Sequence, residues 1–167
     1  MGRAVSLHVG LNRLDPARYG TDASLDAAEA DALAWKAFAE GRGFDARVLL
    51  TAAATHDGIT GAVRAIAQEL AAHPGEGDAI VLITYSGHGT SLRGEDASGD
   101  EGDGADEAWC AYDGLILDDE LGGLWADFPA GARVVVVADS CHSGSVAVMG
   151  ELPDGVFPPN KLHPPPP

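Results

Sequence analysis

Basic residues are scarce in this chain of 167 residues, which has 10 lysines and arginines against 26 aspartates and glutamates. The formal net charge of −16 argues against nucleic acid and anionic membranes as partners, because both are bound through basic surfaces. It favours cationic ligands, either metal ions or basic peptides. The sequence also lacks an apolar run long enough to cross a bilayer.

Cysteine is nearly absent as well. The two cysteines, Cys110 and Cys141, do not form a CxxC pair. The N-terminal residues lack the cleavable apolar segment of a secretory signal. We therefore expect a reducing, cytoplasmic setting for this chain.

Strand-like and helix-like segments alternate along the chain. Apolar and β-branched runs predict strands over residues 4–12, 44–50, 78–85 and 132–138, and helical spacing predicts helices over 24–40, 60–72 and 118–128. Alternation of this kind is typical of an α/β fold with a mostly parallel sheet. The acidic, glycine-rich segment 91–114 is predicted to be a long loop, and Ser24 is the expected N-cap of the first helix. We expect one domain over 1–150 and a proline-rich tail or linker over 151–167.

Polar segments follow the third and fourth predicted strands. These segments are YSGHGT at 85–90 and DSCHSG at 139–144. Sites in open α/β sheets form at the carboxyl ends of strands. If the two strands are neighbours, His88 and Cys141 emerge side by side as a general acid/base and a nucleophile. The N–H groups of Gly89 and Cys141 are then placed to bind a developing oxyanion.

Other readings of these residues remain open. His142 is adjacent to Cys141, but adjacent side chains in extended chain point in opposite directions, so we expect a supporting or surface role for it. Cys110 lies between acidic residues, which suppress thiolate formation, so we expect it to be structural. A zinc site formed by His88, Cys141 and His142 would lack the paired ligand spacing of zinc sites.

YSGHGT and DSCHSGS resemble the two catalytic motifs of the caspase–haemoglobinase clan, and most closely those of metacaspases and bacterial caspase-like peptidases. The resemblance extends to VGLN, LDAAEADA, EGDGADEA and DDEL, and covers residues from about 4 to 148. The separation of His88 and Cys141 also fits it. The resemblance implies a caspase-like α/β/α sandwich and peptide-bond cleavage by a dyad of these two residues, with Gly89 and Cys141 forming the oxyanion hole.

The resemblance also implies a pocket for a basic side chain. Asp139, two residues before Cys141, matches the metacaspase aspartate, where caspases have glutamine. Asp31 and Ser86 match the other pocket residues of the family. Two carboxylates suit a guanidinium or ammonium group, so the expected substrates are proteins or peptides cleaved after Arg or Lys. The alternative for Asp31 is a solvated helix residue.

Calcium is the cofactor that the resemblance to metacaspases implies, although the dyad chemistry itself requires none. Asp103 matches a ligand in the loop after the histidine, and Asp118 and Asp119 match the DD pair. The remaining ligand position is Val148, so one ligand is missing. The alternatives are that Asp118 caps the following helix and that the acidic loop is merely solvated.

The length of the chain is the largest departure from the family. Relatives continue past the nucleophile with strands that complete the sheet, whereas this sequence ends in HPPPP. We therefore expect a large-subunit-like domain that forms a homodimer or is completed by a C-terminal subunit at an open sheet edge. The main hypothesis is a cysteine endopeptidase acting after basic residues. The alternative is a catalytically weak caspase-like scaffold or regulatory module that binds peptide or calcium.

Overall fold

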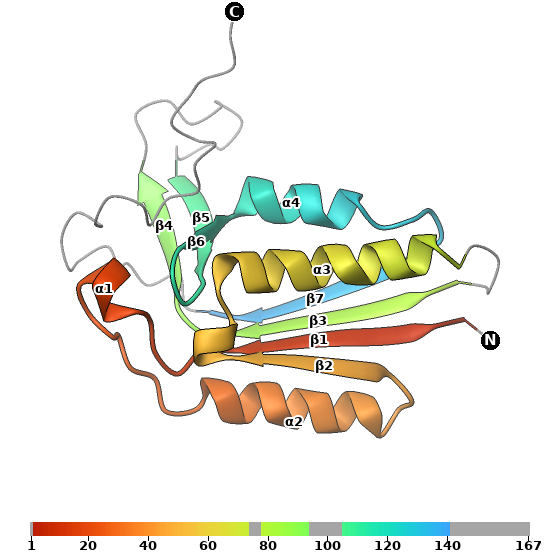
Figure 1. Cartoon of the computed structure of the whole chain (residues 1–167), viewed down its shortest axis with the longest axis horizontal. Helices are drawn as coiled ribbons and strands as arrows, with labels where there is room; N and C mark the ends of the chain where they lie inside the picture. The colour runs from red at the N-terminus through yellow and green to blue at the C-terminus, as the bar shows by residue number, and fades with distance from the viewer. Residues whose placement is uncertain (1, 74–77, 94–104, 141–167) are drawn as a thin grey trace, which may run out of the picture.

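Four parallel strands form the central sheet of the molecule (Figure 1). The computed structural model describes residues 2–73, 78–93 and 105–140. The strands lie in the order β2-β1-β3-β7, and each neighbouring pair is parallel. Their bounds are Ala4–Gly10 for β1, Asp45–Leu50 for β2, Ile80–Ser86 for β3 and Arg133–Asp139 for β7. The predicted α/β class with a mostly parallel sheet is therefore confirmed.

Helices cover both faces of this sheet and produce three layers (Figure 1). Helix α2 lies on one face, and α3 and α4 lie on the other. The bounds are Ala28–Glu40 for α2, His56–Ala71 for α3 and Asp118–Ala126 for α4. The side of α3 that is buried against the sheet carries apolar residues at helical spacing, namely Ile59, Val63, Ile66 and Leu70. This is the α/β/α sandwich that the sequence predicts.

Helix α2 approaches β1 closely because β1 ends in a glycine. A Cβ atom on Gly10 would lie 2.4 Å from the carbonyl oxygen of Ala28 and 2.8 Å from the Cβ atom of Ala32. Ala28 and Ala32 are themselves buried, so small residues form this contact on both elements. The close contact brings the first turns of α2 to the carboxyl end of the sheet, where the candidate site lies.

Three short antiparallel strands form a second sheet, in the order β4-β5-β6. Their bounds are Gly89–Arg93 for β4, Ala105–Cys110 for β5 and Leu115–Leu117 for β6. The prediction of a long loop over 91–114 is therefore wrong for 91–93 and 105–110, whereas 111–114 contain no strand or helix and 94–104 lie outside the described residues. Strands this short carry no clear alternation in the sequence. Cys110 is fully buried in β5, which agrees with a structural thiol.

The start of α2 also differs from the prediction. The helix begins at Ala28 instead of near Ser24, and its N-cap residue, Ala27, has no side chain that can cap it. The side-chain oxygen of Asn12 accepts a hydrogen bond from the backbone N–H of Glu29 instead, at 3.0 Å. The cap therefore comes from a residue distant in sequence, which a local capping rule does not detect.

Helix α3 begins at His56, four residues before the predicted start at Thr60. Its N-cap is Thr55, whose hydroxyl oxygen accepts a hydrogen bond from the Gly58 N–H at 2.9 Å. Two short elements also lie outside the helices and strands that the sequence predicts. They are helix α1 over Pro16–Tyr19 and the 3-10 turn η1 over Thr51–Ala53.

The described residues, which end at Ser140, all lie within 1–150, the range predicted to be one domain. The proline-rich tail expected over 151–167 lies outside them. Within the described ranges, no helix combines the length and the apolar character that a membrane-spanning helix needs.

Candidate active site

The ends of β3 and β7 lie side by side at the carboxyl edge of the parallel sheet. In the register of the two strands, Ser86 is paired with Asp139. The N–H of Gly87, the next residue after β3, donates a hydrogen bond to the carbonyl oxygen of Asp139 at 3.4 Å. The two strands that carry the sequence motifs are therefore neighbours. The expected nucleophile, Cys141, and His142 lie outside the described residues.

The imidazole of His88 is held by one ring nitrogen. Its Nε2 atom lies 2.6 Å from the carbonyl oxygen of Ala23. A carbonyl oxygen only accepts hydrogen bonds, so Nε2 carries the proton and donates it. The Nδ1 atom is buried and has no hydrogen-bond partner within the described residues. In the neutral imidazole, Nδ1 is then the basic nitrogen that is available to a reacting group.

The hydroxyl of Tyr85 holds the turn that carries His88. The Tyr85 hydroxyl lies 2.6 Å from the carbonyl oxygen of His88 and 3.0 Å from that of Cys110, so its proton is shared between two acceptors. The Cys110 N–H donates a further hydrogen bond to the His88 carbonyl at 2.9 Å. The Tyr85 ring stacks on Trp109 with centroids 4.5 Å apart. A Cβ atom on Gly87 would lie 2.8 Å from the Tyr85 hydroxyl, so this turn requires glycine.

Gly89 begins β4 directly after His88 and is paired with Trp109 of β5. It is buried, and its backbone is therefore held by the second sheet. The partner proposed for it in an oxyanion hole is the N–H of Cys141, which lies outside the described part of the chain.

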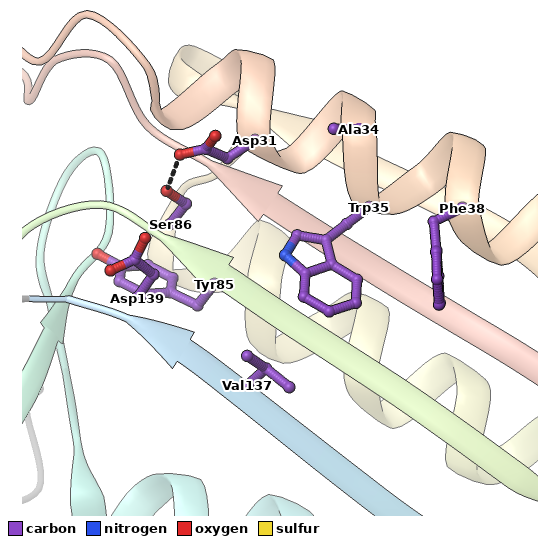
Figure 2. Close-up of a pocket in the computed structure, with 8 residues that line it drawn as sticks. All are labelled: Asp31, Ala34, Trp35, Phe38, Tyr85, Ser86, Val137 and Asp139. Atoms are coloured by element: carbon purple, nitrogen blue, oxygen red, sulfur yellow. Dashed lines mark hydrogen bonds between the residues drawn. The ribbon is translucent and has the colours of Figure 1, made fainter.

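The three predicted pocket residues, Asp31, Ser86 and Asp139, line one cavity of about 360 Å³ (Figure 2). They come from α2, β3 and β7. The Ser86 hydroxyl donates a hydrogen bond to a carboxylate oxygen of Asp31 at 3.3 Å. The other lining residues are Ala34, Trp35, Phe38, Tyr85 and Val137. The cavity thus has two carboxylates at one end and a largely apolar wall along α2 (Figure 2).

Sequence reasoning missed the aromatic wall of this cavity. Trp35 and Phe38 lie in the predicted helix over 24–40 and are apolar residues at helical spacing. Such spacing alone does not distinguish the wall of a pocket from the core. The signal is their spacing from Asp31, because residues three, four and seven positions apart share a helix face. The two rings contact each other edge to face at 5.5 Å, and the Arg42 guanidinium lies 3.5 Å from the Phe38 centroid. These contacts hold the wall in place.

The carboxylates predicted to bind calcium are only partly within the described chain. Asp118 and Asp119 lie in the first turn of α4, and Asp103 and Val148 lie outside the described residues. Asp118 accepts a hydrogen bond from the N–H of Asp119 at 2.9 Å, which satisfies one free donor of the helix start. Within the described ranges, no group of three or more His, Cys, Asp or Glu side chains is placed to hold a metal ion. Two adjacent carboxylates alone do not make a calcium site.

The start of α4 is joined to α3 through His56. The Nε2 atom of His56 lies 3.0 Å from a carboxylate oxygen of Glu120, and its backbone N–H donates to Asp113 at 2.7 Å. Burial alone lowers the pKa of His56, but the hydrogen bonds to Glu120 and Asp57 outweigh burial, and the pKa is raised. The protonated imidazole therefore stabilises this contact between the helices.

Comparison with known proteins shows similarity to metacaspases. A family model described as the metacaspase, peptidase C14 domain, matches residues 6–149. Metacaspase-1 of Arabidopsis thaliana is 41% identical over 75 residues, which are 42% of this chain and 20% of that protein. Metacaspase-1 of Coccidioides immitis is 46% identical over 70 residues, which are 39% of this chain and 15% of that protein.

A solved structure shows the same likeness over more of the chain. The crystal structure of a protein from Geobacter sulfurreducens matches with a TM-score of 0.74 and 45% sequence identity. The match covers 88% of this chain and 53% of the solved chain. The match thus spans about half the length of that neighbour, and the matches to the two curated relatives span a fifth of their length or less.

Proposed function

The chain belongs to the metacaspase family of peptidase C14 domains, and from this premise we propose that it is a cysteine endopeptidase that cleaves after Arg or Lys. The family is one of cysteine peptidases, which are hydrolases. One observation carries the proposal. The Nδ1 atom of His88, which has no partner among the described residues, and the acidic cavity of Asp31 and Asp139 lie at the exits of two neighbouring strands.

The proposed reaction uses His88 as base and then as acid. Its Nδ1 atom takes the thiol proton of Cys141, and the thiolate attacks the carbonyl carbon of the scissile peptide bond. The N–H groups of Gly89 and Cys141 stabilise the oxyanion. The His88 imidazolium then protonates the leaving amine, and an acyl-enzyme remains. Water, deprotonated by His88, hydrolyses the thioester and restores the thiol. The Ala23 carbonyl group keeps the imidazole oriented throughout, since it accepts from the Nε2–H.

The cavity chemistry supports a basic residue before the cleaved bond. The aliphatic stem of an Arg or Lys side chain would lie along Trp35, and its cationic end would meet Asp31 and Asp139. A guanidinium group forms paired hydrogen bonds to carboxylates, which favours Arg over Lys. Among the described lining residues, none is basic, so no lining side chain carries a charge that repels a cation in the cavity.

Covalent labelling tests this proposal. We expect a peptide inhibitor ending in an Arg chloromethyl ketone to modify Cys141 stoichiometrically, as measured by intact mass and peptide mapping. The matched inhibitor ending in Asp should not react at a comparable rate, and the Cys141→Ala variant should not react with either. Equal labelling by both inhibitors would contradict the basic specificity, and absence of labelling would contradict the proposal of a peptidase.

A partner that completes the sheet is also proposed. β7 is the outer strand of the described parallel sheet, and Val135 and Val136 on its opposite faces are 49% and 38% exposed. Strands of parallel sheets are normally covered on both faces, so this edge invites a further strand. We propose a complementing C-terminal segment, and the 53% coverage of the solved neighbour is compatible with it, because almost half of that protein lies outside the match. Light scattering distinguishes this proposal from a homodimer, because it measures the mass of the protein in solution. A dimeric mass for the chain alone would mean that a second copy covers the edge of β7.

The second candidate function is a catalytically weak scaffold or regulatory module, and the open edge of β7 favours it. Such a module would bind Arg-containing peptides in the cavity of Asp31 and Asp139 without cleaving them. Calorimetry with an uncleavable Arg peptide, run beside a turnover assay, separates the two candidates. Binding without turnover supports the module, and turnover supports the peptidase.

A further inference from the structure

Asn12 follows β1 after one residue and joins three parts of the chain by hydrogen bonds. Its side-chain Oδ1 atom accepts from the Glu29 N–H at 3.0 Å, and its carbonyl oxygen accepts from the Leu25 N–H at 2.7 Å. Its own N–H donates to the hydroxyl oxygen of Thr51 at 3.1 Å. The Thr51 hydroxyl in turn donates to the carboxylate of Glu29. Asn12 thus connects the exits of β1 and β2 with the start of α2.

The first of these bonds determines where α2 begins. The first N–H groups of a helix need acceptors, and the N-cap residue, Ala27, offers no side-chain acceptor. The Asn12 amide oxygen supplies one to Glu29. Asp31 lies two residues further along the same turn, with its carboxylate hydrogen-bonded to Ser86 in the cavity. The position of this pocket carboxylate therefore depends on Asn12.

The second bond is made by the main-chain carbonyl of Asn12, and it holds the segment that orients His88. Leu25, whose N–H is bound by Asn12, lies two residues after Ala23, whose carbonyl oxygen accepts from His88 Nε2. Ala23 has a φ of 40°, and Thr51 has a φ of 35°, and no other non-glycine residue of the described chain has a positive φ. Such conformations cost energy and persist only where the surroundings enforce them. Both strained residues belong to the hydrogen-bonded segments that meet at Asn12.

We infer that Asn12 is a positioning residue for the active site, which sets both the Asp31 carboxylate and the carbonyl group that orients His88. Asn12 is not among the residues that line the cavity, so it acts through α2 and through the segment from Ala23 to Leu25. The inference rests on the proposed function for its kinetic consequences. Its structural consequence, the orientation of the His88 ring, does not depend on turnover.

The test compares Asn12→Ala with Thr55→Ala. The control also removes a helix N-cap, but from α3 on the opposite face of the sheet. Asn12→Ala removes the side-chain bond to Glu29 and keeps the main-chain carbonyl that Leu25 binds, so the variant tests whether the side-chain bond is needed to hold that segment in place. With the full chain, nitrogen-15 NMR follows the His88 ring, and we expect Asn12→Ala to weaken the protected Nε2–H signal. We also expect kcat/KM for an Arg peptide to fall about tenfold to a hundredfold, with a rise in KM. Thr55→Ala should lower the melting temperature and leave the His88 signal and KM unchanged.

An unchanged His88 signal and unchanged KM in a folded Asn12→Ala protein would overturn the inference. If Asn12→Ala does not fold, Thr51→Val and Thr51→Ser decide instead. The first removes the hydroxyl that joins Asn12 to Glu29, and the second keeps it, so the Ser variant should retain the His88 signal and the Val variant should lose it. If the unmodified protein cleaves no peptide, the proposed function fails, and the His88 signal still decides the role of Asn12.

Discussion

Ser86 at the end of β3 is paired directly with Asp139 at the end of β7, and the Ser86 hydroxyl also donates to Asp31 of α2. This one serine therefore lies between the two carboxylates of the cavity (Figure 2). Because the pairing is part of the sheet register, the relative placement of Ser86 and Asp139 is as rigid as the sheet itself. That rigidity suits a pocket which must hold a substrate side chain while a neighbouring dyad reacts.

Neutralising Asp139 should impair basic specificity without impairing the thiol. For Asp139→Asn, we expect kcat/KM for an Arg peptide to fall about a hundredfold, since a charge-assisted hydrogen bond contributes about 2 to 3 kcal/mol. The rate of Cys141 alkylation by iodoacetamide should stay the same. Asp127→Asn, an exposed change at the end of α4, is the control. An equal fall in kcat/KM and in the alkylation rate would mean that Asp139 acts on the thiol.

Removing the aromatic wall should weaken substrate binding. In Trp35→Ala, the aliphatic stem of the substrate side chain loses its apolar contact, and we expect KM for Arg and Lys peptides to rise about tenfold. Leu33→Ala is the matched control, because Leu33 is on the same helix, is 47% exposed and does not line the cavity. Steady-state kinetics on the two variants check the prediction, and an unchanged KM in Trp35→Ala would contradict it.

The contact of His56 with Glu120 should depend on pH. The folded pKa of His56 is raised, so its contribution to stability is complete below the unfolded pKa and is lost as the pH rises through the folded pKa. We expect the difference in unfolding free energy between the unmodified protein and His56→Gln to be larger at about pH 5.5 than at about pH 8.5, by up to about 1 kcal/mol. Denaturant titrations at the two pH values measure it. A difference that grows toward alkaline pH would be inconsistent with this contact.

His8 should make the fold sensitive to acid. It is fully buried in β1, between the hydroxyls of Ser6 and Thr84 at 2.9 Å each. Burial, reinforced by Lys36, lowers its pKa from 6.5 to about 4. Because the folded pKa is lower than the unfolded pKa, His8 contributes stability at pH values above the unfolded pKa. This contribution is lost as the pH falls from about 6.5 toward 4, by about 3 kcal/mol in total.

The His8→Gln variant isolates that effect from the titration of carboxylates. Unfolding free energies measured between about pH 7 and pH 4 should fall less steeply in His8→Gln than in the unmodified protein. The variant is expected to be less stable at neutral pH, so the slope is the relevant quantity. Identical slopes would show that His8 does not contribute to the loss of stability at acid pH.

Calcium binding at the carboxylates that the resemblance implies should be weak. Asp118 and Asp119, together with Asp103, would hold the ion through carboxylate oxygens, and Val148 supplies no ligand. We expect calorimetry to give a dissociation constant of about 10⁻⁴ to 10⁻³ M, which Asp118→Asn raises further. Asp127→Asn again serves as the control. Tight binding that is insensitive to Asp118→Asn would assign calcium to another site.

The sequence predicted the features that depend on local pattern. The apolar run before Asp139 and the run before Ser86 indicated two strands, of which β3 is buried and β7 is largely exposed. The polar residues that follow them indicated the site. The grouping of Asp31 with Ser86 came from the resemblance to a family, because no local pattern places residues 55 positions apart in one cavity.

The features that the sequence did not predict depend on contacts that no local pattern shows. The start of α2 depends on Asn12, which lies 17 residues before its hydrogen-bond partner Glu29, and not on Ser24. Strands β4 to β6 are recognisable only when they are paired. Trp35 appeared to be an ordinary core residue because a helix stripe looks the same whether it faces the core or a cavity.

The turnover of matched fluorogenic peptides tests the central claim most directly. Peptides that differ only in the residue before the cleaved bond, Arg, Lys or Asp, would be incubated with the protein and with Cys141→Ala, with and without calcium. We predict that the unmodified protein cleaves the Arg and Lys peptides and leaves the Asp peptide intact, and that Cys141→Ala cleaves none. Absence of turnover under every condition, or equal turnover by Cys141→Ala, would contradict the assignment as a peptidase that acts after basic residues.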